Sequence, residues 1–386
     1  MSKEFLYFDH AATTPIAPVV LDKMMKVLST DFGNPSAVYA LGRKAKSHIE
    51  LSRKQIATSL GIASSQIVFT SGATEANFTI LYHAVVTLGV THIITSKTEH
   101  HAVLENVLLL QERFGITVIY VPVLETGDLD LHFLEHFFKE NADLQQRVLV
   151  SLMHVNNETG VVLDIDFISA ICCEYKAYFH SDTVQSVGKI PIDLEKIPID
   201  FIVCSAHKLQ GPKGVGFFYF RKGIPFRGVF AGGSQEKGLR AGTQGVHNIV
   251  GMAVALQHAI QHLEIHTLAL KKVKTYFIQK ATQEIPELVY NAQSDEVSHR
   301  RSFGIVNMRF TQTSKDTKTL LFALDLQGVA CASGSACQSG STKSSHVLTE
   351  ILSNEVIQMP SIRISFSSQH SLEHIDQLIQ KIKTAL

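Results

Sequence analysis

The chain has 386 residues and is 45% apolar, so it is long enough to bury a large core and to form two domains. Lys plus Arg and Asp plus Glu number 35 each, and this balance gives no sign of direct binding to nucleic acid or to an anionic membrane surface. Residues 1–15 contain no apolar signal region and no run approaches a membrane span, so we expect a cytoplasmic protein.

Short apolar runs alternate with helical patterns over the first 220 residues. The predicted strands are residues 66–70, 91–96, 117–122, 147–155, 177–182, 200–206 and 214–220. The predicted helices between them are residues 75–88, 100–114, 131–140 and 165–176. Because the strands are apolar throughout, this alternation predicts an α/β fold with a mainly parallel sheet covered on both faces. Ligands of such sheets gather at the carboxyl ends of the strands.

A long helical pattern begins near residue 248 and leads out of this first part of the chain. Residues 287–386 then contain strand-like runs at 303–310 and 361–366 and a closing helical pattern at 371–386. This mixture is typical of a smaller α+β domain. We therefore predict a large domain over residues 16–258 and a small domain formed by residues 1–15 and 259–386.

Lys208 directly follows the apolar strand and a short polar turn, and three glycines follow it closely. Desolvation at the end of a buried strand lowers the pKa of an ammonium group. A lysine made neutral in this way can attack a carbonyl carbon and hold an aldehyde cofactor as a Schiff base. The alternative is an ordinary lysine whose ammonium group reaches solvent.

Asp182 ends the predicted strand 177–182, where the sheet would empty into a ligand crevice. A carboxylate in this place can keep a pyridine nitrogen protonated, which makes the ring of pyridoxal phosphate (PLP) an electron sink. Gln185, three residues later, is placed to reach the phenolic oxygen of that ring. The alternative for Asp182 is a helix N-cap or an Asx turn.

The sequence Ser71-Gly72-Ala73-Thr74-Glu75 follows one strand and opens a helix. Small residues let backbone N–H groups approach an anion, and a helix N-terminus favours phosphate. Capping boxes have a similar sequence. Ser205 and His207 follow another strand, so one phosphate would be bound from two strand ends.

Five cysteines, an odd number, argue against a disulfide framework. We expect Cys172, Cys173 and Cys204 to be small core residues, and Cys331 as well. Cys337 differs, because the segment 332–345 is rich in Ser, Gly and Ala, a composition typical of a mobile, exposed loop. An accessible thiol there can ionise and act as a nucleophile.

Arg363 is a cation on the otherwise apolar run 361–366, and it is either part of a structural ion pair or a bidentate partner for a substrate carboxylate. Residues 132–136 match the H-x-x-E-H pattern of some zinc peptidases. No further ligand set accompanies them in the sequence. We therefore predict no metal site of the chain's own.

Taken together, these motifs resemble the cysteine desulfurases of the iron–sulfur-cluster and nitrogen-fixation type, a branch of the class-V aminotransferases. The resemblance runs over nearly the whole length, in the order YFDHAATTP, GNPSAVYALGRKA, TSGATEAN, EH, MHVNNETGVV, HSDTVQSVGKIPIDL, SAHKLQGPKGVG, GGSQEKGLRAGT, ASGSACQSGS and SIRISF. It implies the aspartate-aminotransferase-like fold of PLP-dependent transferases, with a seven-stranded, mainly parallel sheet in the large domain and a smaller α+β domain that carries the cysteine loop.

The resemblance also implies roles for residues around the cofactor. Lys208 would carry the PLP Schiff base and move protons, and His100 would stack on the ring. Asp182 would pair with the pyridinium nitrogen and Gln185 with the phenolic oxygen. The residues implied in phosphate binding are Ala73, Thr74, Ser205 and His207, together with Thr243 of the partner subunit in a homodimer.

For the substrate, the resemblance implies that Asn156, which also contacts the cofactor, and Arg363 hold the carboxylate of L-cysteine. Cys337 would attack the substrate sulfur, leaving a persulfide on the enzyme and releasing L-alanine. The persulfide would pass to an acceptor protein such as an iron–sulfur scaffold, on which Cys337 could transiently ligate a cluster. Whether iron–sulfur assembly, tRNA thiolation or cofactor synthesis is served stays open.

Two positions depart from the family pattern: Ala206 replaces a usual glycine, and Ser367-Ser368-Gln369 replaces a frequent Gly-Arg pair. A selenocysteine lyase or an aminotransferase on the same fold is an alternative, although an aminotransferase needs no thiol in the loop. A sulfur-relay or assembly protein, with turnover that depends on a partner, is a second alternative.

Overall fold

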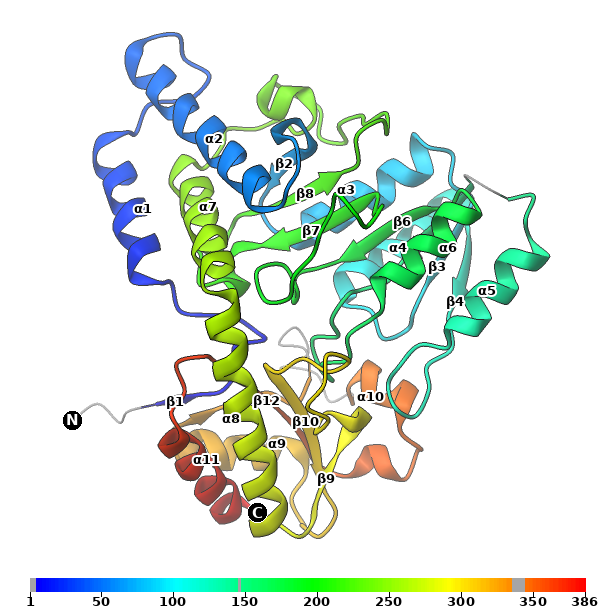
Figure 1. The fold of residues 1–386 in the computed structure, drawn as a ribbon, viewed down its shortest axis with the longest axis vertical. Coiled ribbons are helices and arrows are strands. Elements are labelled where there is room, and N and C mark those ends of the chain that lie inside the picture. The colour runs from blue at the N-terminus through cyan, green and yellow to red at the C-terminus, as the bar shows by residue number, and fades with distance from the viewer. Residues whose placement is uncertain (1–4, 145–146, 335–343) are drawn as a thin grey trace.

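The computed structural model describes residues 5–144, 147–334 and 344–386. Its largest sheet runs in the order β2-β8-β7-β6-β5-β3-β4 (Figure 1). The strands are β2 (Ile67–Thr70), β3 (His92–Thr95), β4 (Thr117–Tyr120), β5 (Val148–Ser151), β6 (Tyr178–Asp182), β7 (Phe201–Ser205) and β8 (Gly216–Phe220). Within this sheet β8 is antiparallel to both of its neighbours, and the other pairs are parallel. The predicted seven-stranded, mainly parallel sheet is confirmed.

Helices cover both faces of this sheet because its strands are apolar on both sides. In β7, Phe201 and Val203 join one buried cluster, whereas Ile202 and Cys204 join the other, as the two-residue period of a strand requires. The helices on the first face are α3 (Ala73–Val86) and α4 (His101–Phe114). Those on the second face are α5 (Leu131–Glu140), α6 (Ile165–Glu174) and α7 (Val246–Gln261), with α1 (Pro18–Thr30) and α2 (Ala40–Ser59) packed against α7.

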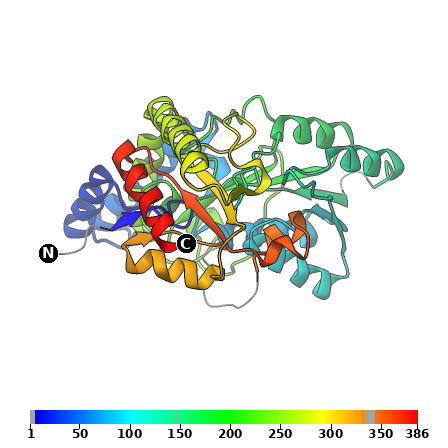
Figure 2. The same ribbon diagram turned by 90° about the horizontal axis from the view of Figure 1, so that it is seen from below.

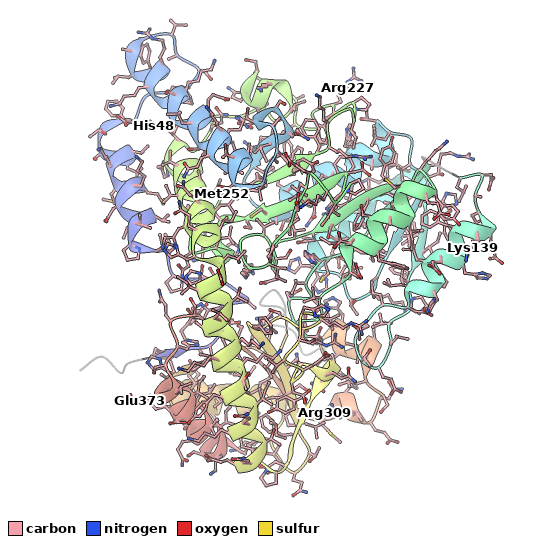
Figure 3. The ribbon with its side chains drawn as sticks, viewed as in Figure 1. His48, Lys139, Arg227, Met252, Arg309 and Glu373 are labelled. Carbon is pink, nitrogen blue, oxygen red and sulfur yellow. The ribbon has the colours of Figure 1, made fainter. Side chains whose placement is uncertain are left out.

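A second, smaller sheet lies below the first in Figure 1, and its antiparallel order is β12-β10-β9. Its strands are β9 (Leu288–Tyr290), β10 (Ile305–Phe310) and β12 (Ser361–Ser365). The small sheet is covered by α8 (Leu263–Glu284), α9 (Thr317–Leu326) and α11 (Leu372–Ala385). Figure 2 shows α11 beside α8. The short helix α10 (His346–Ile351) follows the segment 335–343, which is not described. Figure 3 labels Met252, fully buried in the core of the large sheet, and Arg309 on β10.

The N-terminal segment connects the two sheets. Strand β1 (Leu6–Tyr7) pairs in parallel with β11 (Val329–Ala330), and Asp9 bridges to Ser365 of β12. A few residues later the backbone N–H of Thr14 donates to the carbonyl of His207, 2.9 Å away, next to the large sheet. Helices α7 and α8 make a second connection, since they are separated only at His262 and follow one another in Figure 1.

One packing prediction is wrong. Cys173 is exposed, whereas its neighbour Cys172 is buried, because successive residues of α6 point about 100° apart around the helix. Cys204 is buried as predicted, and Cys331 is partly buried against the core of the small sheet. Across the described residues, we find no helix with both the length and the apolar character needed to span a membrane.

Candidate active site

The carboxyl ends of β2, β7, β6, β5 and β3 lie at one edge of the large sheet, because these strands share one direction. Almost all of the described residues that the sequence singles out follow these strand ends. They are Ala73, Thr74, His100, Asn156, Asp182, Gln185, Ser205, His207 and Lys208. Polar groups at the ends of parallel strands are the usual make-up of a ligand crevice in this class of fold.

Lys208 ends a single 3-10 turn, Ala206–Lys208, that follows β7 directly. Its Nζ donates hydrogen bonds to two backbone carbonyls of the N-terminal segment, Ala11 at 2.6 Å and Ala12 at 2.8 Å. The amine is thus directed at protein groups, and it sits where the chain crosses from the small sheet to the large one.

Asp182 is buried at the end of β6, and both of its carboxylate oxygens accept hydrogen bonds. Oδ2 accepts from Nδ2 of Asn77 at 2.8 Å, and Oδ1 accepts from the N–H of Val184 at 3.0 Å. The second bond is the Asx turn considered as the alternative for this residue, so the turn and the buried carboxylate occur together. Asn77, fully buried on α3, was not predicted, because α3 carries several polar side chains and the sequence does not show which of them meets Asp182.

Gln185 belongs to a chain of hydrogen bonds that leads to the lysine. Its Nε2 donates to the carbonyl of Ala11 at 2.8 Å, the same carbonyl that accepts from Lys208. Its Oε1 accepts from Nζ of Lys189 at 2.8 Å. Burial, followed by the nearby Lys208 charge, lowers the pKa of Lys189 to about 7. Lys189 was also missed by the sequence reasoning, because a lysine in a turn has no distinctive pattern.

His100 and Glu99 follow β3, and burial disfavours the charged form of each. Nδ1 of His100 accepts from the N–H of Ala102 at 3.0 Å, which caps α4 and leaves the proton of the neutral ring on Nε2. Burial is the main cause that lowers the pKa of His100. Burial also raises the pKa of Glu99 well above its usual value, and its Oε1 accepts from the N–H of Met153 at 2.6 Å.

The N-terminus of α3 forms an anion cradle beside β7. No side chain caps this end of the helix, so its first N–H groups, those of Ala73 and Thr74 included, are available to a ligand. A Cβ added to Gly72 would lie 4.0 Å from Oγ of Ser205, which places that hydroxyl at the cradle. A Cβ on Gly216 would lie 2.8 Å from the Cα of Gly72, so the two backbones approach as closely as only glycine permits.

His207 and Thr243, the other two residues implied in phosphate binding, come from two further segments of the chain. Nδ1 of His207 shares a hydrogen bond with Oγ1 of Thr13 at 3.1 Å, and burial lowers the pKa of this imidazole to about 4. Thr243 is exposed in its own subunit. It follows Arg240, which forms a two-pronged ion pair with Glu75 of α3, at 2.7 and 3.0 Å.

Asn156 and Arg363 meet at the turn that follows β5. Nδ2 of Asn156 donates to the carbonyl of Thr98 at 3.0 Å, and its Oδ1 accepts from two N–H groups of the same turn. Nη1 of Arg363 donates to the carbonyl of Asn157 at 2.9 Å. Nη2 pairs with Asp9 at 2.6 Å, which is the structural ion pair considered as the alternative. Among the described residues, the buried Nε has no hydrogen-bond partner.

Cys337 lies outside the described residues, but the residues on either side of that segment contact the same edge of the sheet. Oγ of Ser345 donates to the buried carboxylate of Glu158. A Cβ on Gly334 would lie 3.0 Å from Oε2 of that carboxylate. Nε2 of His346 hydrogen-bonds the carbonyl of Glu99 at 2.8 Å. Both flanks of the cysteine segment are therefore attached beside Asn156 and His100.

These groups fit PLP. The uncapped N-terminus of α3 with Ser205 suits a phosphate, the buried Asp182 suits a protonated ring nitrogen, and Lys208 supplies an amine between them. Among the described residues, no group of three or more His, Cys, Asp or Glu is placed to hold a metal ion.

Comparison with known proteins agrees with this arrangement. Residues 6–378 match the aminotransferase class-V family model. The chain is 36% identical to the cysteine desulfurase IscS of Dictyoglomus turgidum over 99% of its own length and 96% of that protein. It is 32% identical to a solved NifS-like protein, with a TM-score of 0.87 and 99% of each chain covered. A structure of SspA in complex with cysteine is also 32% identical, with a TM-score of 0.79 over 95% of this chain and 99% of that one. The chain therefore belongs to the class-V aminotransferase family, in its cysteine desulfurase branch.

Proposed function

We propose that this protein is a PLP-dependent cysteine desulfurase that converts L-cysteine to L-alanine and carries the sulfur as a persulfide on Cys337. The observation that carries the proposal is the joint placement of Lys208, Asp182 and the α3 cradle at one sheet edge, beside the flanks of the Cys337 segment. The match to cysteine desulfurases over nearly the full chain supports the same reaction.

In this proposal PLP is held at both ends. The phosphate lies at the N-terminus of α3, bound by Ala73, Thr74, Ser205 and His207, with Thr243 of the partner subunit completing the cradle. Asp182, kept in place by Asn77, would pair with the ring nitrogen. His100 faces the ring as a neutral imidazole, Gln185 donates to the phenolic oxygen, and Asn156 contacts the ring edge. When bound, PLP withdraws electrons from the substrate Cα.

Lys208, the amine that would anchor PLP, would also hold and move the proton of the substrate Cα. Arg363 and Asn156 bind the substrate carboxylate, and the buried Nε of Arg363 offers a donor that no group in the described part of the chain uses. With its carboxylate bound in this way, the substrate would have its charged end at the turn that follows β5. The thiol of the substrate would then lie near the flanks of the Cys337 segment.

The sulfur step needs a second thiol. The thiolate of Cys337 attacks Sγ of the substrate, the S–Cβ bond breaks, and the electron pair of that bond goes to the substrate, which takes up protons and leaves as alanine. One sulfur atom moves from L-cysteine to Cys337, so the overall change is balanced without an external oxidant or reductant. The persulfide then passes to a thiol of an acceptor protein such as an iron–sulfur scaffold.

We also infer a cytoplasmic homodimer. Helix α1 exposes Leu21, Met25 and Leu28 on one face, each with 46–56% of its surface accessible, and this apolar face suits a second copy of the chain. Thr243 is exposed in its own subunit, as a residue that serves the partner's site must be.

The predicted domain division, residues 16–258 against 1–15 with 259–386, is supported by the separate cores. The buried clusters on the two faces of the large sheet use residues between Ala17 and Leu256. The cluster of the small sheet uses Leu6, Phe8 and residues from Val273 onward.

Two variants test the proposed reaction. In the purified holoenzyme, Cys337→Ser should keep PLP and its visible absorbance but lose sulfide production from L-cysteine in the presence of a thiol reductant. The matched control is Cys173→Ser, which removes an exposed thiol on α6 and should leave sulfide production unchanged. Normal sulfide production by the Cys337 variant would refute the persulfide mechanism.

Lys208→Ala should remove the visible absorbance that PLP acquires when it is bonded to the enzyme. An unchanged spectrum would refute the assignment of Lys208. Comparing L-cysteine with L-selenocysteine as substrates then separates a desulfurase from a selenocysteine lyase.

A further inference from the structure

A cavity of about 280 Å³ lies behind Lys208, and the proposed reaction makes no use of it. It is bounded by the N-terminal segment, the turn after β6, the junction of α7 and α8, and the small sheet. Its lining contains Lys208 and Gln185, but none of Asp182, His100, Asn156 and Ser205. The cavity therefore adjoins the proposed cofactor site at Lys208 and Gln185 but does not include the residues proposed for the ring nitrogen, the ring face and the α3 cradle.

The side chains around the cavity have an uneven charge distribution. Among the described residues, those that line it include basic or imidazole side chains and no aspartate or glutamate. The basic and imidazole side chains are His10, Lys189, Lys208, His258, His266, His299 and Arg301. A cavity with donors of this kind and no carboxylate favours an anion.

Lys189 is the cation best placed to bind that anion. Arg301 already pairs with Asp128 through two hydrogen bonds, at 3.0 and 2.8 Å. Nζ of Lys189 donates a hydrogen bond to the neutral amide oxygen of Gln185 at 2.8 Å. A bound carboxylate would supply the opposite charge that this ammonium does not receive from a neutral amide.

Most of the remaining wall is apolar, and it comes from both halves of the molecule. The apolar side chains are Val162, Ile190, Pro191, Leu209, Leu263, Leu270, Phe303, Ile305 and Phe366. An apolar cavity of about 150 Å³ admits benzene, so the present volume accepts a ring or a short chain together with a charged head. The matching ligand is a small amphipathic carboxylate.

We propose that this cavity is a second ligand site, which binds a small amphipathic carboxylate with its head on Lys189 and its body against the apolar wall. The site is coupled to the lysine of the proposed reaction. Lys189 bonds to Gln185, Gln185 donates to the carbonyl of Ala11, and that carbonyl accepts from Lys208. A negative charge bound to Lys189 therefore changes, through this series of hydrogen bonds, the hydrogen bonding of Lys208. The coupling of the second site to Lys208 rests on the proposed function, whereas the binding of a carboxylate in the cavity does not.

Isothermal titration calorimetry of the holoenzyme with 3-phenylpropanoate tests the binding. We expect measurable binding of this carboxylate. Its neutral analogue 3-phenylpropanamide should bind at least about tenfold more weakly, because the amide lacks the negative charge. Lys189→Met should weaken binding of the carboxylate by a similar factor, and Lys189→Arg should restore it. Equal binding of amide and carboxylate, or no binding of the carboxylate, would overturn the proposal.

A second set of variants locates the site. Thr267→Phe from α8 and Ser368→Phe from the opposite wall fill the cavity without removing a lining charge, and each should abolish binding. Two fillers are used so that a folding defect in one does not decide the result, and PLP content and melting temperature show which variants are folded. Arg363→Ala removes the proposed carboxylate site of the substrate and should leave binding unchanged. Binding that survives both fillers, or is lost only with Arg363→Ala, would contradict the proposal.

The coupling between the second site and Lys208 is measured by the visible absorbance of the holoenzyme. Saturation with 3-phenylpropanoate should shift the visible absorbance of the wild-type holoenzyme and not that of the Thr267→Phe variant. Binding without any shift would refute the coupling and leave the second site in place. Because calorimetry does not depend on turnover, loss of the desulfurase proposal would leave the binding result intact.

Discussion

A buried ion pair between Arg53 and Glu236 provides a quantitative test of how the segment that carries Thr243 is held. Arg53 lies on α2, and Glu236 lies in the 3-10 turn Gln235–Gly238. The two side chains are 3% and 1% exposed and are joined by hydrogen bonds of 2.6 and 2.9 Å. Glu236 also accepts from the N–H of Phe69 in β2 at 2.9 Å, so the pair connects three parts of the chain.

Arg53→Met should lower the free energy of unfolding by about 3–5 kcal/mol, because it leaves a carboxylate buried without its cation. The double variant Arg53→Met with Glu236→Leu should regain most of this loss, since neither charge is then left unpaired. The control is Lys196→Met, which breaks an ion pair of 2.8 Å with Asp193 whose side chains are 83% and 45% exposed. That change should cost less than about 1 kcal/mol.

The assay is equilibrium unfolding in urea, followed by far-ultraviolet circular dichroism because the chain contains no tryptophan. All variants should be compared at one protein concentration, since dimerisation adds a concentration-dependent contribution to apparent stability. A loss below about 1 kcal/mol in Arg53→Met would refute the reasoning. So would a double variant as unstable as the single one.

Two further predictions concern pH and cofactor affinity. Burial lowers the pKa of His180 from 6.5 to about 4, so the unfolded chain takes up this proton at a higher pH than the folded protein does, and stability falls as the pH drops from 6.5 towards 4. His180→Gln should make the melting temperature fall less steeply over this pH range. A profile as steep as that of the wild type would contradict the prediction. Gly216→Ala should weaken PLP binding, measured as a dissociation constant, because its methyl group would lie 2.8 Å from the Cα of Gly72 at the cradle. The control Gly304→Ala places a methyl group 3.7 Å from its nearest neighbour and should leave PLP affinity unchanged.

The site residues that could be predicted are those that directly end or follow a strand in the sequence. Lys208 and Asp182 were found because an apolar run stops and a polar residue follows directly, which is a short-range pattern. Asn77 and Lys189 were missed for different reasons. Asn77 meets Asp182 across 105 residues, and no helical or strand period records such a contact. Lys189 lies only four residues from Gln185, but nothing in a turn sequence shows that its amine points inward.

Packing was harder to predict than the positions of the strands in the sequence. The seven apolar runs became the seven strands of the large sheet because each was bounded by polar turn residues. Strands β1 and β11 have two residues each, too few to show a two-residue period, and they were missed. The ion pair of Arg363 with Asp9 spans 354 residues, so the sequence showed a buried cation but not its partner.

The N-terminal segment has a consequence for biosynthesis. The carbonyls of Ala11 and Ala12 meet Lys208, but the strand before them pairs with Val329 and Ala330, and the N–H of Ala11 donates to Ser365 at 2.9 Å. Ribosomes add roughly 5–20 residues per second, so these first residues wait tens of seconds for their partners. The large sheet can form during translation, whereas the surroundings of the lysine close only when the last strand is made. Cofactor capture is therefore expected to be a late, largely post-translational event.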